Sequence, residues 1–166
     1  AAGDDLLYGL GGNDQIIDGP GHDISHGGDG DDTLFGGFGG DQLFGGEGND
    51  AIGIALTGGI VRVIADGGTG NDVINVINGS PSNTNQPVTV TGGEGADQIS
   101  LGGFAPGNLI DAGAGNDRVT LGSALGGEIT LGSGADVLLA LGTFRPPANG
   151  FQVVDFEAGV DHLDFN

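Results

Sequence analysis

A nine-residue pattern repeats without a change of register through the first third of the chain. The units GGDGDDTLF, GGFGGDQLF and GGEGNDAIG follow one another directly from residue 27 to residue 53. Each unit has glycine in the first, second and fourth places, aspartate in the sixth and an aliphatic residue in the eighth. A flexible linker has no use for a fixed register. The pattern therefore indicates that each residue occupies the same position in successive turns of a coil.

The glycine-rich part of each unit predicts a tight turn, and the rest predicts a short strand. Glycine supplies the positive φ angles that such a turn needs. The last three residues make a strand about 10 Å long, in which the eighth residue points to the opposite side from its neighbours. One unit reverses the chain once, so two units complete a coil, and the fold expected is an all-β parallel solenoid. The inward-facing residues expected are Leu34, Leu43, Ile52, Ile74, Ile99, Val119 and Leu138.

After Gly53 the glycine turns return at longer intervals. Turns begin again at residues 67, 92, 112 and 131, with short alternating β-branched segments between them, which are typical of strands. The segment NGSPSNTNQP, residues 78–87, predicts a loop. The chain thus divides into three segments of one continuous solenoid: a regular roll over 1–53, widened coils with one glycine turn each over 54–139, and a capping segment over 140–166.

Charge is the strongest compositional constraint on partners. The chain has 23 acidic residues against three arginines and no lysine, for a net charge of −20. This charge excludes nucleic acid as a partner, because phosphate recognition needs Lys and Arg. There is no apolar run of about 20 residues, so membrane insertion is not expected. Without cysteine, the chain has neither disulfides nor thiolate metal ligands. Such self-repulsion opposes compaction unless cations cancel it.

The sixth-place aspartates predict where those cations bind. Same-side turns stack at about 4.8 Å, and Ca²⁺ holds its oxygen ligands at about 2.4 Å, so an ion fits between two stacked turns. Turns on the same side of the roll predict two unequal columns of aspartates. One ion is expected in each interval, which is the gap between consecutive aspartates of one column. Two intervals in the short column and six in the long column predict about eight Ca²⁺ ions. The short column contains Asp5, Asp23 and Asp41, and the long column contains Asp14, Asp32, Asp50, Asp72, Asp97, Asp117 and Asp136.

These units resemble the RTX, or haemolysin-type calcium-binding, repeat family. The resemblance covers residues 1–53 continuously and single motifs up to residue 139, and the ending VVDFEAGVDHLDF is similar to segments that close RTX arrays. It implies a right-handed parallel β-roll with stacked Ca²⁺-binding turns, whose ligands are the sixth-place carboxylates and the backbone carbonyls of the first four turn positions. The carbonyl ligands implied are those of Gly27, Gly28, Asp29, Gly30, Gly36, Gly37, Phe38, Gly39, Gly45, Gly46, Glu47, Gly48, Gly67, Gly68, Thr69, Gly70, Gly92, Gly93, Glu94 and Gly95. The chain departs from the family pattern, which affects individual sites and not the architecture, at Leu10, Ser25, Ala112, Leu131 and Ser133.

The resemblance also implies a location and a function. RTX proteins leave Gram-negative bacteria by type I secretion, so the chain is expected outside the cell or on its surface. Extracellular calcium modules work at about 10⁻⁴–10⁻³ M Ca²⁺, so the chain is expected to stay loose in the cytosol and to fold after export. One role is a structural or adhesive protein of a surface layer or biofilm. The other is a C-terminal appendage of a secreted metalloprotease, lipase or alginate epimerase. The widened coils and the long loop favour the structural role.

Further expectations concern partners, catalysis and the histidines. Besides calcium ions, copies of the chain itself and cell-surface polysaccharide are the partners considered. The chain begins inside a repeat, which indicates a piece of a longer protein. It has no H-E-x-x-H or G-x-S-x-G motif, so this part is not expected to be an enzyme. The stretch HDISH, with His22 and His26, is conceivable as a transition-metal site, but its variable repeat positions favour solvent-exposed residues without that role.

Overall fold

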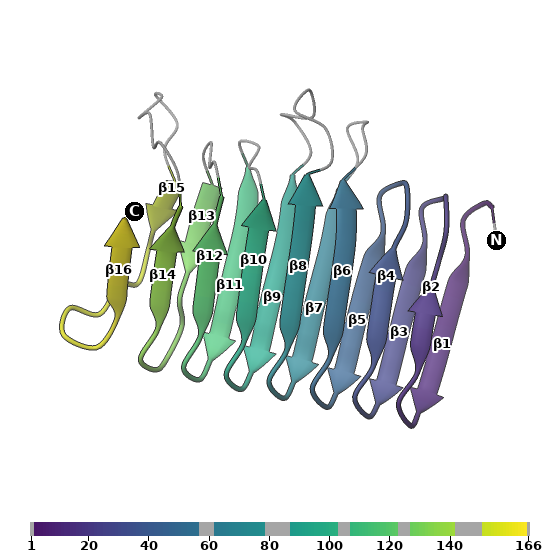
Figure 1. Cartoon of the computed structure of the whole chain (residues 1–166), viewed down its shortest axis with the longest axis horizontal. Helices are drawn as coiled ribbons and strands as arrows, with labels where there is room; N and C mark the ends of the chain where they lie inside the picture. Colours follow the sequence, from purple (N-terminus) through teal and green to yellow (C-terminus); the bar gives the residue numbers. More distant parts are fainter. Residues whose placement is uncertain are drawn as a thin grey trace.

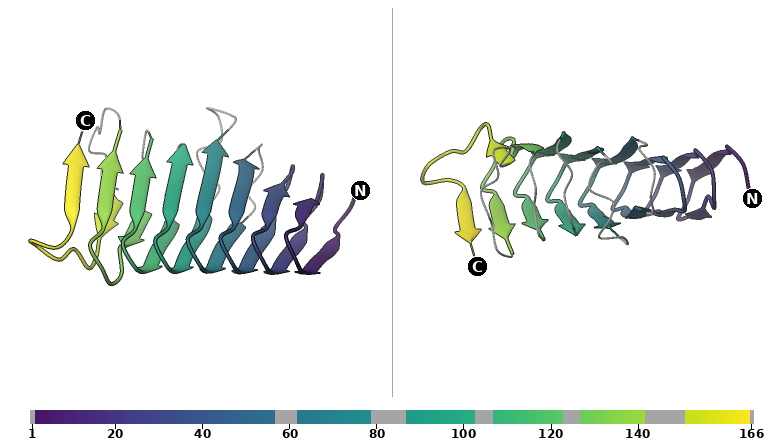
Figure 2. Two further views of the ribbon diagram at one scale, coloured as in Figure 1. Left: turned by 60° about the horizontal axis from the view of Figure 1, so that its bottom comes forward. Right: turned by 90° about the horizontal axis from the view of Figure 1, so that it is seen from above.

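The chain winds as a flattened solenoid whose strands alternate between two facing sheets (Figure 1). The structure, a computed structural model, describes residues 2–56, 62–78, 87–102, 107–122, 127–141 and 151–165. Within each sheet every strand pairs in parallel with the strand two places along the chain. Crossovers between parallel strands are right-handed. The chain therefore forms the expected right-handed parallel β-roll, and Figure 2 shows its two layers from above.

Each sheet has eight strands in the described ranges. The first sheet contains, in spatial order, β1 (Leu6–Gly11), β3 (Ile24–Asp29), β5 (Gln42–Glu47), β7 (Val63–Thr69), β9 (Val88–Glu94), β11 (Asn108–Ala114), β13 (Gly127–Thr130) and β15 (Phe151–Val153). The second contains β2 (Gln15–Ile17), β4 (Thr33–Gly36), β6 (Ala51–Leu56), β8 (Val73–Asn78), β10 (Gln98–Gly102), β12 (Arg118–Leu121), β14 (Val137–Ala140) and β16 (His162–Phe165). In the part of the chain described, no helix has the length and apolar character needed to cross a membrane.

The coils lengthen to a maximum between Asp72 and Asp97 and then shorten, as the spacing of the glycine turns predicts. Aspartates that hydrogen-bond from one coil to the next are 18 residues apart between Asp32 and Asp50, and 22 apart between Asp50 and Asp72. The later steps are 25, 20 and 19 residues. The extra residues lengthen the strands, from three in β2 to six in β6 and β8. The division into three segments stays a prediction, and the expected loop over 78–87 lies, apart from its ends, outside the described residues.

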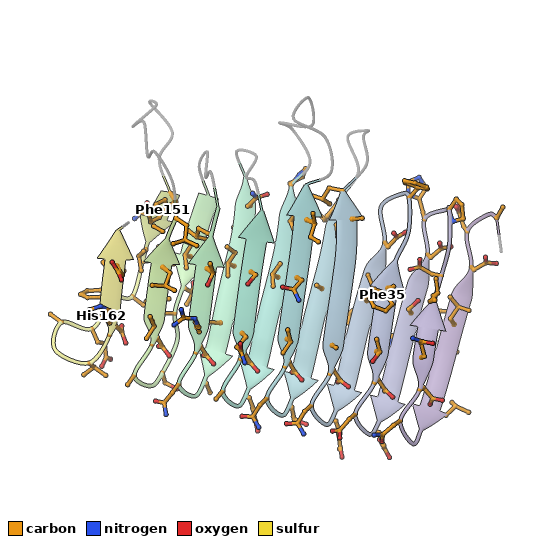
Figure 3. All side chains as sticks on the ribbon, viewed as in Figure 1. Phe35, Phe151 and His162 are labelled. Atoms are coloured by element: carbon orange, nitrogen blue, oxygen red, sulfur yellow. The ribbon has the colours of Figure 1, made fainter. Side chains whose placement is uncertain are left out.

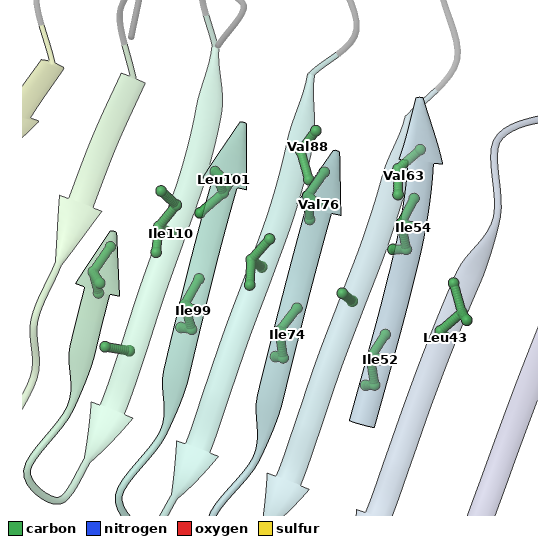
Figure 4. Packing of buried hydrophobic residues seen from close by; sticks show 14 of the residues in the cluster. Leu43, Ile52, Ile54, Val63, Ile74, Val76, Val88, Ile99, Leu101 and Ile110 are labelled. Atoms are coloured by element: carbon green, nitrogen blue, oxygen red, sulfur yellow. The ribbon is translucent and has the colours of Figure 1, made fainter. Parts of the chain in front are cut away.

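The interior between the sheets is a continuous apolar column (Figure 4). All seven eighth-place residues predicted to face inward are at most 1% exposed, which confirms the predicted inward face. The longer coils add a second inner row, which includes Ile54, Val63 and Val76. Burying such a side chain contributes about 1.5–3 kcal/mol, so the wider coils carry more apolar stabilisation than the narrow ones. Ser25 is also fully buried, and it pairs in register with Leu7 and Leu43.

The outer faces carry ordered rows of side chains. On the first sheet, the ring of His26 stacks between those of Tyr8 and Phe44, with centroids 5.0 and 4.9 Å apart. On the second sheet, Phe35 of β4 is about half exposed (Figure 3). These rows follow from the parallel register, because residues paired across neighbouring strands point to the same side.

Candidate metal sites

The sixth-place aspartates form two hydrogen-bonded columns along the solenoid. In each column the carboxylate Oδ1 accepts the backbone N–H of the aspartate one coil earlier, at 2.7–3.1 Å. Asp5, Asp23 and Asp41 form the short column. The long column contains Asp14, Asp32, Asp50, Asp72, Asp97, Asp117 and Asp136. The structure thus aligns all ten predicted aspartates in the two unequal columns expected. That these columns hold ions stays a prediction.

The long column continues through one residue that the repeat pattern did not single out. The N–H of Asp136 donates to Oδ1 of Asp161 at 3.2 Å, and Oδ2 of Asp161 accepts the N–H of Glu157. The sequence does contain a signal that Asp161 belongs to the column. His162 and Leu163 follow it in the aspartate–any–aliphatic order of the other units. Leu163 pairs with Leu138 in β16, so this last segment completes one more coil of the roll.

The second carboxylate oxygen of each column aspartate has no protein partner. Oδ2 is buried and accepts no hydrogen bond in any of the ten predicted aspartates. Eight of these residues, from Asp23 onward in either column, are at most 2% exposed. A buried acceptor without a partner costs about 1–3 kcal/mol, and more if it is charged. A row of such oxygens on consecutive coils fits a row of cations.

In the first five long-column turns, the first glycine leaves open the space beside this oxygen. A Cβ added to Gly9 would lie 2.7 Å from Oδ2 of Asp14 and 2.5 Å from the carbonyl oxygen of Gly27 in the next coil. The same two kinds of oxygen surround the added atom at Gly27, Gly45, Gly67 and Gly92. The strand pairing also skips this place, since Tyr8 pairs with His26 and Leu10 with Gly28. Carboxylate and carbonyl oxygens are the hard ligands that Ca²⁺ prefers, so the residues present fit this ion.

The remaining turn positions differ in how free their carbonyls are. The third-place carbonyl accepts the fourth-place N–H of the preceding coil, as in the 2.7 Å bond from Gly30 to Glu47. Among the carbonyls expected to be ligands, those of Asp29, Phe38, Glu47, Thr69 and Glu94 accept such a bond, and so do the third-place carbonyls of Pro20, Ala114 and Ser133. A cation at these oxygens would share them with an amide. In the long column the second and fourth places have positive φ, for example 122° at Gly46 and 129° at Gly48. The choice of individual carbonyl ligands stays a prediction.

Burial makes the column carboxylates hard to ionise without a cation. Desolvation raises the pKa of Asp41, Asp72 and Asp117 to about 6, although a backbone N–H that each accepts partly offsets it. Repulsion from neighbouring carboxylates adds to each rise. Burial likewise raises the pKa of Asp50 and Asp97. A divalent cation would reverse the effect, because it stabilises the ionised form.

Some turns depart from the pattern. Leu10 takes the second place with a φ of 80°, a value that favours glycine, and its side chain is 75% exposed. Ala112 and Leu131 take the first place of their turns and are fully buried. The two histidines of HDISH make different contacts. Nδ1 of His22 accepts the N–H of Gly40, and the ring of His26 lies in the aromatic stack.

Comparison with known families agrees with the repeat pattern. A family model described as the RTX calcium-binding nonapeptide repeat matches the chain in four copies, over residues 1–24, 17–52, 87–105 and 107–124. Together these stretches span just over half of the 166 residues. No curated protein and no solved structure matches the chain significantly.

Proposed function

We propose that this chain, which belongs to the RTX calcium-binding nonapeptide repeat family, folds on binding Ca²⁺ after secretion and forms part of a structural or adhesive protein outside the cell. Family membership makes it a calcium-binding domain with a β-roll fold. One observation carries the calcium-dependent folding: buried aspartate Oδ2 atoms without a protein partner recur on every described coil up to Asp136.

The energy of these carboxylates makes folding depend on a cation. Eight column aspartates are at most 2% exposed, and an uncompensated buried charge costs several kcal/mol. A whole domain is stable by only about 5–15 kcal/mol. The cost of burying these charged carboxylates therefore exceeds the stability of the whole domain unless cations or protons neutralise them. Since the unfolded chain has no preformed site, the binding free energy becomes folding free energy.

Calcium fits this spacing better than magnesium. Coils separated by the parallel strand distance of about 4.8 Å leave room for oxygens about 2.4 Å above and below an ion. Mg²⁺ requires octahedral bonds of about 2.1 Å and gives up its water reluctantly. Eight ions, one for each predicted interval, would bring the net charge from −20 to about −4, which a folded domain tolerates.

The calcium dependence supports a location outside a Gram-negative cell. Extracellular calcium modules bind at about 10⁻⁴–10⁻³ M, which is far above a calcium-poor cytosol. The chain would remain unfolded, and able to pass through a type I exporter, until it reaches the medium. Because calcium is scarce inside the cell and abundant outside, the chain would fold only after export.

The outer faces support a structural role more than a catalytic one. A hollow on the second sheet is lined by apolar and amide residues, among them Phe35, Gly53 and Ile77, and by no titratable side chain. A second hollow, on the first sheet, is lined by threonines and two carboxylates, Asp111 and Glu128, without a nucleophile and base in an enclosed site. Open sheet faces with shallow apolar and threonine-lined hollows suit contact with other chains or with polysaccharide. The isolated chain is expected to show no protease, lipase or epimerase activity.

Circular dichroism tests the folding part of the proposal. In EDTA the far-ultraviolet spectrum should be that of a disordered chain, and millimolar Ca²⁺ should convert it to β-structure. The same concentration of Mg²⁺ is the control and should leave the chain largely disordered. An identical spectrum with EDTA and with Ca²⁺ would show that the ion is not required for folding.

A further inference from the structure

One turn of the short column carries an aspartate where the repeat has its first glycine. Asp18 begins the unit DGPGHDISH, and its side chain is 1% exposed. Its Oδ1 accepts the N–H of Gly19 in the same turn and the N–H of Gly37 in the next coil, both at 2.7 Å. The carboxylate is thus held inside the roll, between two stacked turns. In the long-column turns that keep the first glycine, a Cβ at this place would lie beside Oδ2 of the sixth-place aspartate.

This placement brings three carboxylates together. Asp18, Asp23 and Asp41 each offer an oxygen, and these oxygens lie within 4.8 Å of one another. Two oxygens bound to the same Ca²⁺ at about 2.4 Å are at most about 4.8 Å apart, and the three oxygens meet this condition in every pair. Independently of this grouping, Oδ2 of Asp23 and Oδ2 of Asp41 are buried without a hydrogen-bond partner, in side chains that are 0% exposed.

We propose that Asp18 is a third carboxylate ligand at the interval between turns 18–23 and 36–41, and that this interval is the tightest cation site of the chain. The inference rests on the proposed calcium binding. A long-column interval joins two column aspartates, whereas this one has three carboxylates at the same backbone spacing. Ligand charge raises calcium affinity. The same charge favours a trivalent lanthanide over Ca²⁺ more strongly than it does at two-carboxylate intervals.

The three carboxylates lie at the last described interval of the short column. Asp41 is the last aspartate of this column in the described residues, and its neighbours in the site are Asp23 and Asp18. Three buried carboxylates repel one another until a cation is present. This interval is therefore expected to fill first in a calcium titration and to order the coils from β3 to β5 before the rest.

Replacing Asp18 by asparagine removes the charge and keeps an Oδ1 acceptor for Gly19 and Gly37. Calorimetric titration of the full chain with CaCl₂ alone should show a tightest class of sites in the wild type that is weakened at least about tenfold in Asp18→Asn. Asp18→Gly, which restores the repeat residue, should show the same loss. Asp111→Asn is the matched control, since it removes one exposed charge on the outer face of β11.

Europium supplies a readout that a purely structural role of Asp18 would not move. The excitation band of bound Eu³⁺ shifts with the total charge of its ligands. The wild type and Asp111→Asn should show a band for a three-carboxylate site, which Asp18→Asn and Asp18→Gly should lack. If Asp18→Asn keeps both this band and the tightest calcium class while the wild type folds with Ca²⁺, the third-ligand assignment is wrong and the proposed function stands. If the wild type binds no Ca²⁺, both are wrong.

Discussion

Replacing Asp97 by asparagine separates the charge of the long column from its hydrogen bonds. Oδ1 of Asp97 accepts the N–H of Asp72, and the N–H of Asp97 donates to Oδ1 of Asp117, both at 2.8 Å. Asparagine keeps the Oδ1 acceptor and the backbone N–H, so the ladder can remain. The substitution removes the negative charge of the buried carboxylate. Under the proposal this charge contributes to two ion sites, one on either side of Asp97.

The size of the effect follows from that position. If each interval binds Ca²⁺ about tenfold more weakly, each loses about 1.4 kcal/mol of binding free energy. Two intervals lose about 2.8 kcal/mol, which appears as lost folding free energy when calcium is in excess. For a domain of this size, about 2–4 °C of Tm corresponds to each kcal/mol. Asp97→Asn should therefore melt about 6–11 °C lower than the wild type.

The assay is thermal unfolding followed by circular dichroism in millimolar Ca²⁺. Asp111→Asn carries the same charge change on an exposed side chain, and its stability should stay within about 0.5 kcal/mol of the wild type. In calcium-depleted buffer, where the wild type is expected to be disordered, Asp97→Asn should keep at least as much β-structure as Asp111→Asn, because it removes a buried carboxylate that has no cation. Equal melting temperatures for the two variants in saturating calcium would refute the reasoning that Asp97 acts through bound ions.

Two further predictions concern protons and backbone strain. Because burial raises the pKa of Asp41, Asp72 and Asp117 from 3.8 to about 6, the folded chain binds more protons than the unfolded chain between these values, so stability without calcium falls as pH rises through this window. Circular dichroism in calcium-depleted buffer should show more β-structure at pH 5 than at pH 7, and a loss on acidification would contradict this. Leu10→Gly should raise the free energy of unfolding by about 1 kcal/mol, because Leu10 has a φ of 80° and glycine adopts that angle without a Cβ clash. Thermal melts in calcium compare the variant with the wild type, and a lower Tm would show that the exposed leucine side chain contributes more than the strain.

The repeat pattern was sufficient to predict the fold and the alignment of the ten sixth-place aspartates in two columns. The eighth-place residues, such as Leu34 and Ile99, predicted the buried column, because period-2 alternation in a strand decides which side chain faces inward. The interval of 25 residues between Asp72 and Asp97 predicted a wider coil on the same side, and the hydrogen bond between them confirms it. These inferences succeeded because each depends only on the order and spacing of the repeats along the chain.

Contacts between residues at unequal repeat positions needed the tertiary structure. In the sequence, Asp18 is a first-place substitution in an irregular unit, and only the stacking of two coils places its carboxylate beside Asp23 and Asp41. Asp161 joined the long column because β16 pairs in register with β14, although its turn lacks the double glycine. The aromatic stack through His26 likewise depends on parallel register. The sequence determined the repeating unit and the direction of its side chains, since both follow from backbone geometry within nine residues. Which carboxylates lie close together was decided by the stacking of the coils, which only the packed sheets set.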